Sequence, residues 1–405
     1  MFICIAGKNN IAVNVLEYLV KNNNKRYELG VVCNKTEKGI NTWQKSLRYF
    51  AKKYNVKEYR IENIYQINQL LFISLEFDRI INTQYFKDAR LYNIHFSLLP
   101  KYRGMYTSAF PILNGEEKSG VTLHKIDNGI DTGDIISQIC FELSPMITSR
   151  ELYKKYIFYG TKLMLEYIER LINNKICSVS QIENEATYYS KKSIDYKNID
   201  IDLCQPSNII DRQIRAFNFR EYQLPIVYGK EIIETKITKI KSQYKPGRII
   251  YEDIHGMLIS SMDYNILLLY DRLDELLCAC KTGDIKIVQD ICIVSSHINA
   301  KGFNGWSPLM VATYYNQKDI VKYLIMAGAN ICQKSNNGTN LLMYAKDAYL
   351  TYRDITLFNF FCDLGLDETE KDYEGHDLLY YIQELEYDNS KLLYSIMLKN
   401  KNINY

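Results

Sequence analysis

The chain has 405 residues, of which 47% are apolar and 24% are charged, the composition of a globular protein with two or three domains. Its formal net charge of +3 is nearly neutral and argues against a nucleic-acid or membrane surface as the main partner. Its ten cysteines include no CxxC pair and no His/Cys spacing suited to zinc, so we expect no metal, reduced thiols and a cytoplasmic protein.

Short apolar runs alternate with helical patterns over the first 180 residues. The sequence predicts strands at residues 2–7, 28–33, 58–61, 77–82 and 92–96, and helices at 11–22, 43–54 and 65–72. This alternation is typical of a Rossmann-like α/β domain with a mainly parallel sheet, in which ligands bind beyond the carboxyl ends of the strands. The "GKNN" after the first strand is not GxGxxG, which disfavours a dinucleotide, although Lys8 and Asn9 can still contact an anion.

A long helix is predicted over residues 149–174, with Thr148 and Glu151 as its capping box. The chain then changes character. From 181 to 270 it is rich in β-branched residues and tyrosine, and we expect strands in "EIIETKITKI", "GRIIYEDI" and "GMLISSM", with a small helix near 206–217. We interpret this region as a β-rich linker that contributes to substrate binding and dimerisation.

From about residue 271 the sequence repeats itself. The segment "NGWSPLMVATYYNQKDIVKYLIMAGAN" begins at an Asn-Gly pair, and a second Asn-Gly pair lies 33 residues further on, at 337–338. Ser307-Pro308-Leu309-Met310 stands where ankyrin repeats have Thr-Pro-Leu-His, and the period also resembles that of the ankyrin family. This resemblance predicts an α-helical ankyrin domain over 271–405.

Two polar motifs lie in the first 180 residues. "NIHFSLLPKYRG" (93–104) places Asn93 and His95 at the end of a predicted strand, and "GVTLHKIDNGIDTGDII" (120–136) is a Gly-rich loop that carries Asp131. Taken separately, the first suits a packed histidine under a turn. The second suits a solvated hairpin, since it lacks the dense ligand spacing of a calcium loop.

Together the two motifs resemble those of the folate-dependent formyltransferases, which act on methionyl-tRNA, glycinamide ribonucleotide or nucleotide-sugar amines. The resemblance covers residues 1–180, which it implies form the catalytic domain. It also implies that Asn93, His95 and Asp131 are the catalytic residues and that N10-formyltetrahydrofolate is the co-substrate, with no metal. It further implies that the folate lies near Tyr85, Lys125, Asp127, Gly129 and Asp131.

The chemistry of formyl transfer suits these three residues. The reaction passes through a tetrahedral oxyanion and must remove a proton from the attacking amine. Asn93 can donate an amide N–H to the oxyanion, and His95 can accept the proton or polarise the formyl oxygen. Asp131 can orient His95 and stabilise its charged form.

Several features favour a nucleotide sugar over tRNA as the acceptor. The chain continues into ankyrin repeats where a tRNA enzyme has a basic barrel, and "GKNNIAVN" and "FDRIIN" resemble the sugar branch. We expect a dTDP-amino-dideoxy sugar, with dTDP-3-amino-3,6-dideoxy-D-glucose as the first choice, in O-antigen or lipopolysaccharide biosynthesis. The expected acceptor contacts are Lys8, Asn9, Arg79, Arg103, Phe219 and Tyr222.

Other interpretations stay open on the sequence. A dTDP-4-amino-4,6-dideoxyglucose enzyme, a methionyl-tRNA formyltransferase with a replaced tail, a formyl-folate hydrolase and an ankyrin scaffold with an inactive formyltransferase domain are the alternatives. Trp306 lies beside an Asn-Gly turn, where we expect it to be exposed. It is our candidate for an auxiliary site for a second nucleotide sugar or a protein partner. We also expect a homodimer.

Overall fold

The structure is a computed structural model that describes residues 1–302, 304–385, 391–395 and 397. The chain forms two compact units, Met1–Leu268 and Leu269–Tyr405. Each unit is described by itself. Within the described residues, no helix is both long and apolar enough to span a bilayer.

The first unit begins with the α/β part. Its strands are β1 (Phe2–Gly7), β2 (Glu28–Cys33), β3 (Lys57–Glu58), β4 (Leu70–Leu75), β5 (Ala89–His95), β6 (Arg103–Gly104), β7 (Lys118–Lys125), β8 (Ile135–Glu142) and β9 (Tyr188–Tyr189). Its helices are α1 (Asn9–Asn22), α2 (Leu47–Lys53), α3 (Phe110–Leu113) and α4 (Ser149–Ile172), with 3-10 turns η1 (Ile61–Asn63), η2 (Thr83–Tyr85) and η3 (Glu183–Glu185).

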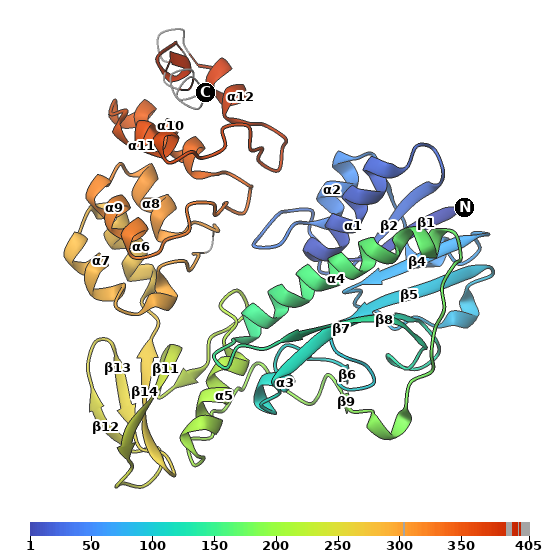
Figure 1. Cartoon of the computed structure of the whole chain (residues 1–405), viewed down its shortest axis with the longest axis horizontal. Helices are drawn as coiled ribbons and strands as arrows, with labels where there is room; N and C mark the ends of the chain where they lie inside the picture. The colour runs from blue at the N-terminus through green and yellow to red at the C-terminus, as the bar shows by residue number, and fades with distance from the viewer. Residues whose placement is uncertain (303, 386–390, 396, 398–405) are drawn as a thin grey trace. The chain divides into compact units, whose positions relative to one another are not determined.

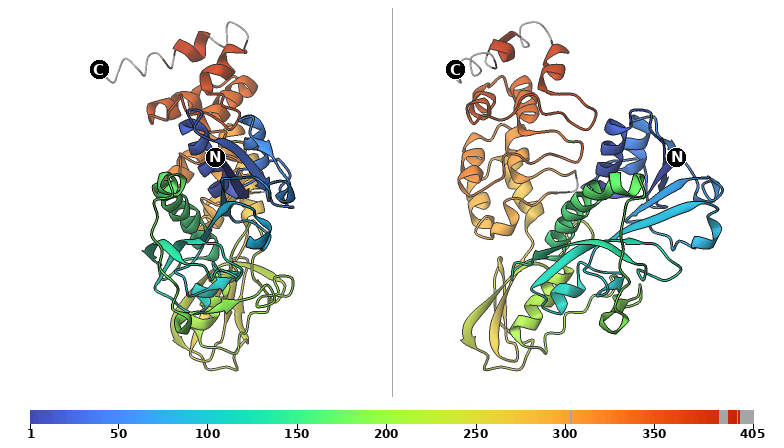
Figure 2. Two further views of the ribbon diagram at one scale, coloured as in Figure 1. Left: turned by 90° about the vertical axis from the view of Figure 1, so that its right-hand side faces the viewer. Right: turned by 45° about the vertical axis from the view of Figure 1, so that its right-hand side comes forward.

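The main sheet has the strand order β3-β2-β1-β4-β5-β7-β8. The pairs from β3 to β5 are parallel, and β7 and β8 join antiparallel at one side. Figures 1 and 2 show α1 and α4 on one face of this sheet. On the other face, Ile61 and Ile64 at η1 and Ile81 after β4 pack against apolar side chains of the strands. Because both faces are covered, β1 and β4 are buried along their whole length. The expected α/β class with a mainly parallel sheet is confirmed.

Three element predictions in this part are wrong. The strand predicted at 58–61 ends at Glu58, and Ile61 already belongs to η1. Residues 65–72 do not form a helix, since their apolar end belongs to β4, and residues 77–82 form a loop, not a strand. A short apolar run does not distinguish a buried strand from a helix, and here burial between β1 and β5 decides. The predicted capping box is present, because Thr148 accepts from the Glu151 N–H and the Glu151 carboxylate accepts from the Thr148 N–H.

The first unit ends in a second, antiparallel sheet. Helix α5 (Ser207–Phe217) packs on β11 and precedes the sheet. The strand order is β10-β11-β14-β13-β12. The strands are β10 (Ile226–Val227), β11 (Lys230–Lys241), β12 (Ile249–Glu252), β13 (Gly256–Ile259) and β14 (Tyr264–Tyr270).

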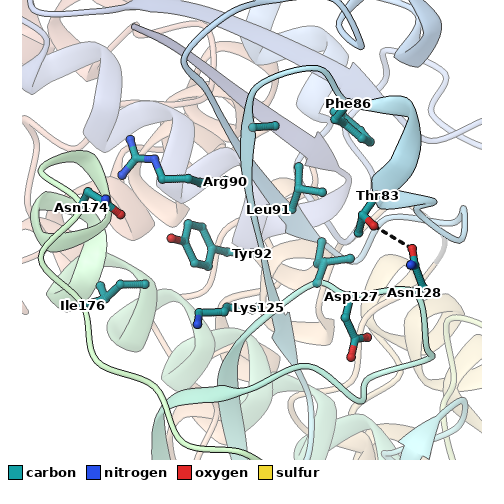
Figure 3. A pocket seen from close by; sticks show the side chains of 12 residues that line it. Thr83, Phe86, Arg90, Leu91, Tyr92, Lys125, Asp127, Asn128, Asn174 and Ile176 are labelled. Atoms are coloured by element: carbon teal, nitrogen blue, oxygen red, sulfur yellow. Dashed lines mark hydrogen bonds between the residues drawn. The ribbon is translucent and has the colours of Figure 1, made fainter.

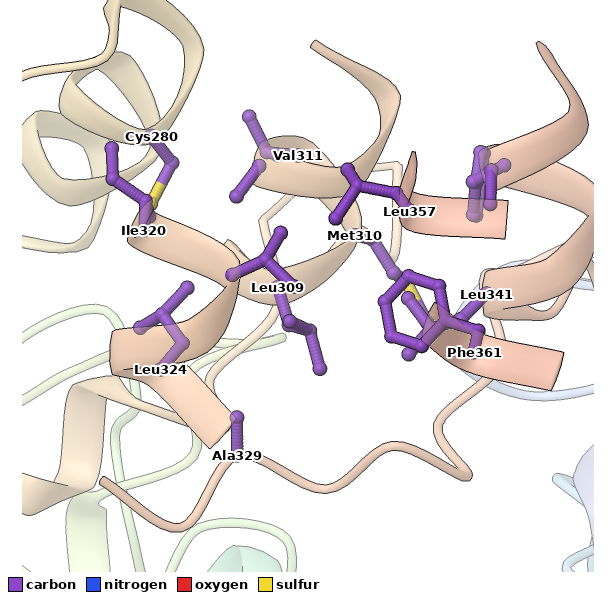
Figure 4. Close-up of a cluster of buried hydrophobic side chains, with 14 of the residues drawn as sticks. Cys280, Leu309, Met310, Val311, Ile320, Leu324, Ala329, Leu341, Leu357 and Phe361 are labelled. Atoms are coloured by element: carbon purple, nitrogen blue, oxygen red, sulfur yellow. The ribbon is translucent and has the colours of Figure 1, made fainter. Parts of the chain in front are cut away.

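The second unit consists of paired helices. They are α6 (Leu273–Thr282), α7 (Ile285–Ile291), α8 (Pro308–Tyr314), α9 (Lys318–Met326), α10 (Leu341–Tyr352), α11 (Thr356–Asp363) and α12 (Leu378–Gln383), with a 3-10 turn η4 (Ser295–His297). Apolar side chains of successive pairs form one continuous core, including Leu309, Leu324 and Phe361 (Figure 4). Ser307 caps α8 through the N–H of Met310. This stacking is how ankyrin units bury their apolar faces.

Trp306 is not an exposed ring, contrary to our expectation. It is partly buried against the helical core, and its centroid lies 5.2 Å from that of Tyr314 and 4.8 Å from that of Tyr344. The turn that we expected to project the ring instead folds it onto α8 and α10. Only part of its surface is available to a ligand.

Candidate active site

Asn93 and His95 lie on β5 and point to the sheet face opposite α4. Between them, Ile94 faces α4, because a Cβ atom added at Gly160 of that helix would meet the Ile94 side chain at 3.1 Å. Side chains alternate along a strand, so Asn93 and His95 share the other face. The antiparallel register places His124 of β7 opposite Asn93. The fold therefore brings three polar side chains together on one patch of the sheet.

The ring of His95 is held by the loop that follows β5. Its Nε2 atom lies 2.7 Å from the carbonyl oxygen of Tyr102, so Nε2 carries the proton that is donated to this carbonyl. In the neutral ring Nδ1 is then free of a proton, and it faces the Asp131 carboxylate at 3.4 Å. His95 can accept a proton at Nδ1, where Asp131 would stabilise the resulting charge.

The loop that holds His95 is itself anchored to β7 and β8. The Thr122 hydroxyl accepts from the Leu99 N–H at 3.1 Å and donates to the Ser97 carbonyl at 2.7 Å. Gln138 donates to the Leu99 carbonyl at 2.9 Å. These bonds hold the "SLLP" turn against the sheet. This turn places the Tyr102 carbonyl within hydrogen-bond distance of His95 Nε2.

His124 plays the corresponding role for Asn93. Its Nδ1 atom lies 2.7 Å from the Lys125 carbonyl oxygen and donates to it, so Nε2 is an acceptor in the neutral ring. The Asn93 amide donates to this Nε2 at 3.0 Å. One amide hydrogen of Asn93 is thereby engaged, and the other is left for a ligand oxygen. The sequence did not single out His124, and its only signal was its place opposite Asn93 once the strands were paired.

Asp131 reaches the two histidines from the loop between β7 and β8. Its backbone is in the left-handed region with φ 56°, and its carboxylate accepts from the Gly104 N–H at 2.9 Å. The His124 ring lies 3.6 Å away. Burial would raise the pKa of Asp131, but the positive charge that His95 and His124 carry when protonated, together with the Gly104 N–H, outweighs it and holds the pKa well below its usual range. Asp131 is therefore a fixed negative charge beside His95.

The catalytic trio predicted from the sequence lines one cavity of about 950 Å³, a size suited to sizeable ligands. Its wall is formed by the segments after β1, β4, β5 and β7, together with α4 and the chain beyond α5. Among the residues that we expected to bind substrate or folate, those that line it are Lys8, Arg79, Asp127, Gly129, Asp131, Phe219 and Tyr222.

Arg103 is not among the residues that line this cavity, although we expected it to contact the acceptor. Its side chain is buried and donates to Gln181 at 2.8 Å and to Glu183 at 2.7 Å. Gln181 also donates to the backbone carbonyls of Asp131 and Gly133. Arg103 therefore braces the segment that holds the Asp131 loop. The sequence alone does not distinguish an exposed arginine that binds a ligand from a buried arginine that pairs with a carboxylate.

Tyr85 and Lys125 also lie outside the larger cavity. Tyr85 is 58% exposed, with its ring against Tyr65. Lys125 lines a second, smaller cavity of about 630 Å³, whose lining side chains are drawn in Figure 3. Its Nζ atom lies 3.2 Å from the carboxylate of Asp134. Asp127 lines both cavities, and its carboxylate accepts from the Gly129 N–H and the Thr132 hydroxyl, which shapes the loop.

Glu76, Tyr153 and Lys191 are among the further side chains that line the larger cavity without a sequence prediction. Glu76 follows β4, Tyr153 comes from α4, and Lys191 follows β9. Asn9, which we expected to contact the substrate, instead donates to Glu76 at 2.6 Å and to Tyr153 at 2.9 Å. A tyrosine on a helix and a glutamate after a strand carry no motif, so only the tertiary structure identifies them. Among the described residues, no group of His, Cys, Asp and Glu is placed to hold a metal ion.

The site combines an amide donor, an imidazole acceptor and a buried carboxylate. An N–H of Asn93 can stabilise a developing oxyanion, and Nδ1 of His95 can accept a proton with Asp131 beside it. None of these three residues is a Ser, Thr, Cys or Lys, and the arrangement suits direct transfer of an acyl group between two bound molecules.

Comparison with known proteins agrees with this chemistry. Residues 3–168 match the family model of the formyl transferases, and residues 276–395 match that of ankyrin repeats in three copies. A methionyl-tRNA formyltransferase of Fervidobacterium nodosum is 30% identical over 230 residues, which are 54% of this chain and 72% of the relative.

Two solved structures are more similar in sequence. WlaRD, a sugar 3N-formyltransferase determined in the presence of dTDP and 5-N-formyltetrahydrofolate, is 44% identical with a TM-score of 0.62. The match covers 67% of this chain and 98% of WlaRD, so a third of this chain lies outside it. The N-formyltransferase of Helicobacter canadensis, in complex with folinic acid and dTDP-3-aminofucose, is 43% identical over 66% of this chain and 99% of that chain, with a TM-score of 0.62. This chain belongs to the folate-dependent formyltransferases, is similar to the sugar N-formyltransferases among them, and carries ankyrin repeats after its formyltransferase part.

Proposed function

We propose that the chain transfers the formyl group of N10-formyltetrahydrofolate to the amine of a dTDP-linked 3-amino-3,6-dideoxyhexose. The observation that carries this proposal is the larger cavity with Asn93, His95 and Asp131 in its wall, within a chain that is 43–44% identical to two sugar N-formyltransferases along almost their whole length. The methionyl-tRNA relative of Fervidobacterium nodosum is less similar, at 30% over 72% of its length.

In this proposal each polar group has one role. The free amide N–H of Asn93 stabilises the oxyanion that forms when the sugar amine attacks the formyl carbon. His95 accepts the amine proton at Nδ1, and Asp131 stabilises the imidazolium. The bond between the formyl carbon and N10 then breaks, and the proton on His95 passes to the N10 nitrogen that leaves. The Tyr102 carbonyl and His124 keep His95 and Asn93 in place throughout.

The remaining wall of the cavity suits a nucleotide sugar. Lys8 and Arg79 line it and can pair with a diphosphate, and Lys191 adds a third cation. Tyr222 is 58% exposed and packs against Phe219 with ring centroids 4.7 Å apart, which leaves an aromatic surface for a thymine base. For the folate we propose the loop of Asp127, Gly129 and Asp131.

The test is a formylation assay with N10-formyltetrahydrofolate and a panel of dTDP-amino sugars. The panel contains the 3-amino and 4-amino 6-deoxyhexoses in the gluco and galacto configurations. We expect turnover of a 3-amino sugar, first the gluco isomer. Turnover of methionyl-tRNA alone, or release of formate with no amine acceptor, would instead support the tRNA or the hydrolase alternative.

We propose that the enzyme is a homodimer formed through the antiparallel sheet of β10 to β14. This region carries many exposed apolar side chains, namely Ile226, Tyr228, Ile237, Ile240, Tyr244, Ile249, Tyr251, Ile254, Met262 and Tyr264. An apolar surface of this extent is typical of an interface. Sedimentation analysis of the full chain tests this, and replacement of Ile240 by Asp should give monomers.

We also propose that the reaction takes place in the cytoplasm, within O-antigen or lipopolysaccharide sugar synthesis. The structure describes all ten cysteines, and none is in a disulfide. Trp306 stays our candidate for an auxiliary ligand site on the ankyrin repeats, with the exposed part of its ring as the contact surface. Calorimetric titration of dTDP-sugar into the wild type and Trp306→Ala tests it, and unchanged stoichiometry would exclude the site.

A further inference from the structure

Glu76 is a part-buried carboxylate in the wall of the larger cavity that formyl transfer does not use. It is the first residue after β4, and its backbone is in the left-handed region with φ 57°. Asn9, just after β1, is also left-handed with φ 64°. Both residues are non-glycine and adopt the left-handed backbone conformation at the ends of two neighbouring strands. This conformation is strained for such residues, and strain of this kind accumulates at functional sites.

Several bonds hold Glu76 in this conformation. The Asn34 amide donates to its backbone carbonyl at 2.8 Å, and the Asn9 amide donates to its carboxylate at 2.6 Å. The Tyr153 hydroxyl is a further hydrogen-bond partner of the carboxylate. An ionised carboxylate accepts about four hydrogen bonds. The two side-chain donors therefore leave acceptor capacity, and Glu76 lines the cavity where a ligand could use it.

The charge of Glu76 is only partly compensated. Burial raises its pKa, and the bonds from Tyr153 and Asn9 and the charge of Lys8 offset part of that effect. A further hydrogen-bond donor from a ligand would stabilise the ionised Glu76 carboxylate, because each such bond replaces hydration that the carboxylate lost on burial.

The side chains around Glu76 have the chemistry of a carbohydrate site. Tyr153 lines the same cavity and is hydrogen-bonded to Glu76, and Phe219 supports its ring with the two ring centroids 5.5 Å apart. Aromatic faces pack against the C–H groups of a sugar ring, and an ionised carboxylate accepts from its hydroxyls.

The strand order separates this group from the proposed folate loop. Glu76 lies at the end of β4 and Asn9 at the end of β1, while Asn93 and His95 are on β5. The loop of Asp131 comes from β7, on the opposite side of β5 from β4. A ligand that contacts Glu76 can therefore present a group to Asn93 and His95 from the side away from the 125–134 loop.

We propose that Glu76 is the acceptor-binding carboxylate, which accepts a hydrogen bond from a ring hydroxyl of the hexose and so sets the position of the amine before His95. The inference rests on the proposed function and adds that the acceptor must carry a ring hydroxyl that donates to Glu76. A sugar that lacks this hydroxyl leaves Glu76 unpaired and is disfavoured.

A role for Glu76 in bracing Asn9 and Tyr153 alone makes a different prediction. Glu76→Gln keeps an amide oxygen that can accept from both partners but removes the charge. If Glu76 binds the hydroxyl, Glu76→Gln raises KM for the amino sugar about 10- to 100-fold, the scale of a charge-assisted hydrogen bond. The Kd of dTDP alone and the KM of the formyl-folate do not change. A bracing role predicts wild-type KM in Glu76→Gln.

The decisive measurement uses acceptor analogues that lack the 2- or the 4-hydroxyl. The wild type should discriminate against one of them, and Glu76→Gln should lose that discrimination. Equal discrimination by both proteins, or a parallel loss of dTDP affinity, overturns the inference.

Glu142→Gln, which removes an equally negative side chain from the exposed surface of β8, is the matched control. Thermal unfolding shows whether each variant is folded. A wild type that formylates none of the amino sugars contradicts the proposed function itself, and this outcome is distinct from normal turnover that is insensitive to Glu76.

Discussion

The two units of the chain bury very different side chains. Around the larger cavity of the first unit, the buried groups are polar and hold one another, as with His95, His124 and Asp131. The second unit buries a continuous apolar core, and among its buried polar residues Ser307 and Asn340 cap helices. Burying polar side chains lowers stability unless they are hydrogen-bonded, so a buried polar cluster such as this one indicates function. The apolar core of the second unit instead serves to hold successive repeats together.

Left-handed backbone occurs in both units. In the first unit, Asn9, Glu76, Tyr102, Tyr106 and Asp131 lie at or beside the larger cavity, and six further non-glycine residues of this kind lie in turns elsewhere. In the second unit, non-glycine left-handed residues within the described part of the chain are Asn316 and Arg353, both at helix ends. We therefore expect substitutions at the larger cavity to lower activity, and substitutions in the ankyrin repeats to lower stability.

The largest effect is expected for His95→Asn. Without the acceptor at Nδ1, turnover should fall about 1,000-fold, the scale of general-base catalysis. The thermal unfolding temperature should stay near that of the wild type, because the change keeps a polar side chain of similar size. Steady-state formylation and calorimetry measure the two quantities.

His255→Asn is the control for that experiment. It makes the same chemical change in the turn between β12 and β13, away from the larger cavity, and should keep full activity. Retained activity in His95→Asn would show that another group accepts the amine proton.

Phe361→Ala should act in the opposite way. Phe361 is fully buried in the ankyrin core, so its removal should lower the free energy of unfolding of the second unit by about 3 to 4 kcal/mol. Scanning calorimetry of the full chain should show an earlier transition, with the formylation rate at 20 °C unchanged. The neighbouring Phe360→Ala, which removes a partly buried ring, should cost less. A loss of activity that accompanies the stability loss would show that the two units are coupled.

Asp131→Asn should reduce turnover about 100-fold by removing the charge beside His95. It also has a signature in stability. The pKa of Asp131 in the folded chain is below its ordinary value, so the ionised group contributes stability above about pH 4, which is lost as the pH falls through the folded-state value. Wild type and Asp131→Asn should therefore differ most in unfolding free energy near neutrality and converge in acid. A constant difference across urea titrations at pH 3 to 7 would contradict the low pKa.

The smallest effect is expected for Ser307→Ala. Loss of the cap at the start of α8 should lower the stability of the second unit by about 1 kcal/mol and leave activity unchanged. Thr282→Ala, at the exposed end of α6, is a control with a similar side-chain change and no cap to remove. Equal unfolding temperatures for the wild type and Ser307→Ala would show that the cap does not contribute.

Much of this arrangement could be predicted from local patterns. The 33-residue period identified the repeats, and alternation of apolar strands with helices identified the α/β class. Asn93, His95 and Asp131 could be assigned because the two motifs that carry them together resemble those of the folate-dependent formyltransferases, although neither motif alone indicated catalysis. Residues 65–72 could not be assigned, since an apolar run of that length fits either a helix or a buried strand.

The sequence by itself determined which chemistry to expect, because each of the two motifs is one continuous stretch of chain and their resemblance to the formyltransferases is visible without the fold. Only the tertiary structure decided which groups complete the site. It paired His124 with Asn93 across two antiparallel strands, turned Arg103 inward onto Glu183, and brought Glu76 against Asn9 and Tyr153. These contacts join residues far apart in the chain, and their physical cause is burial: a polar side chain enclosed by the fold must find a partner wherever the packing places one.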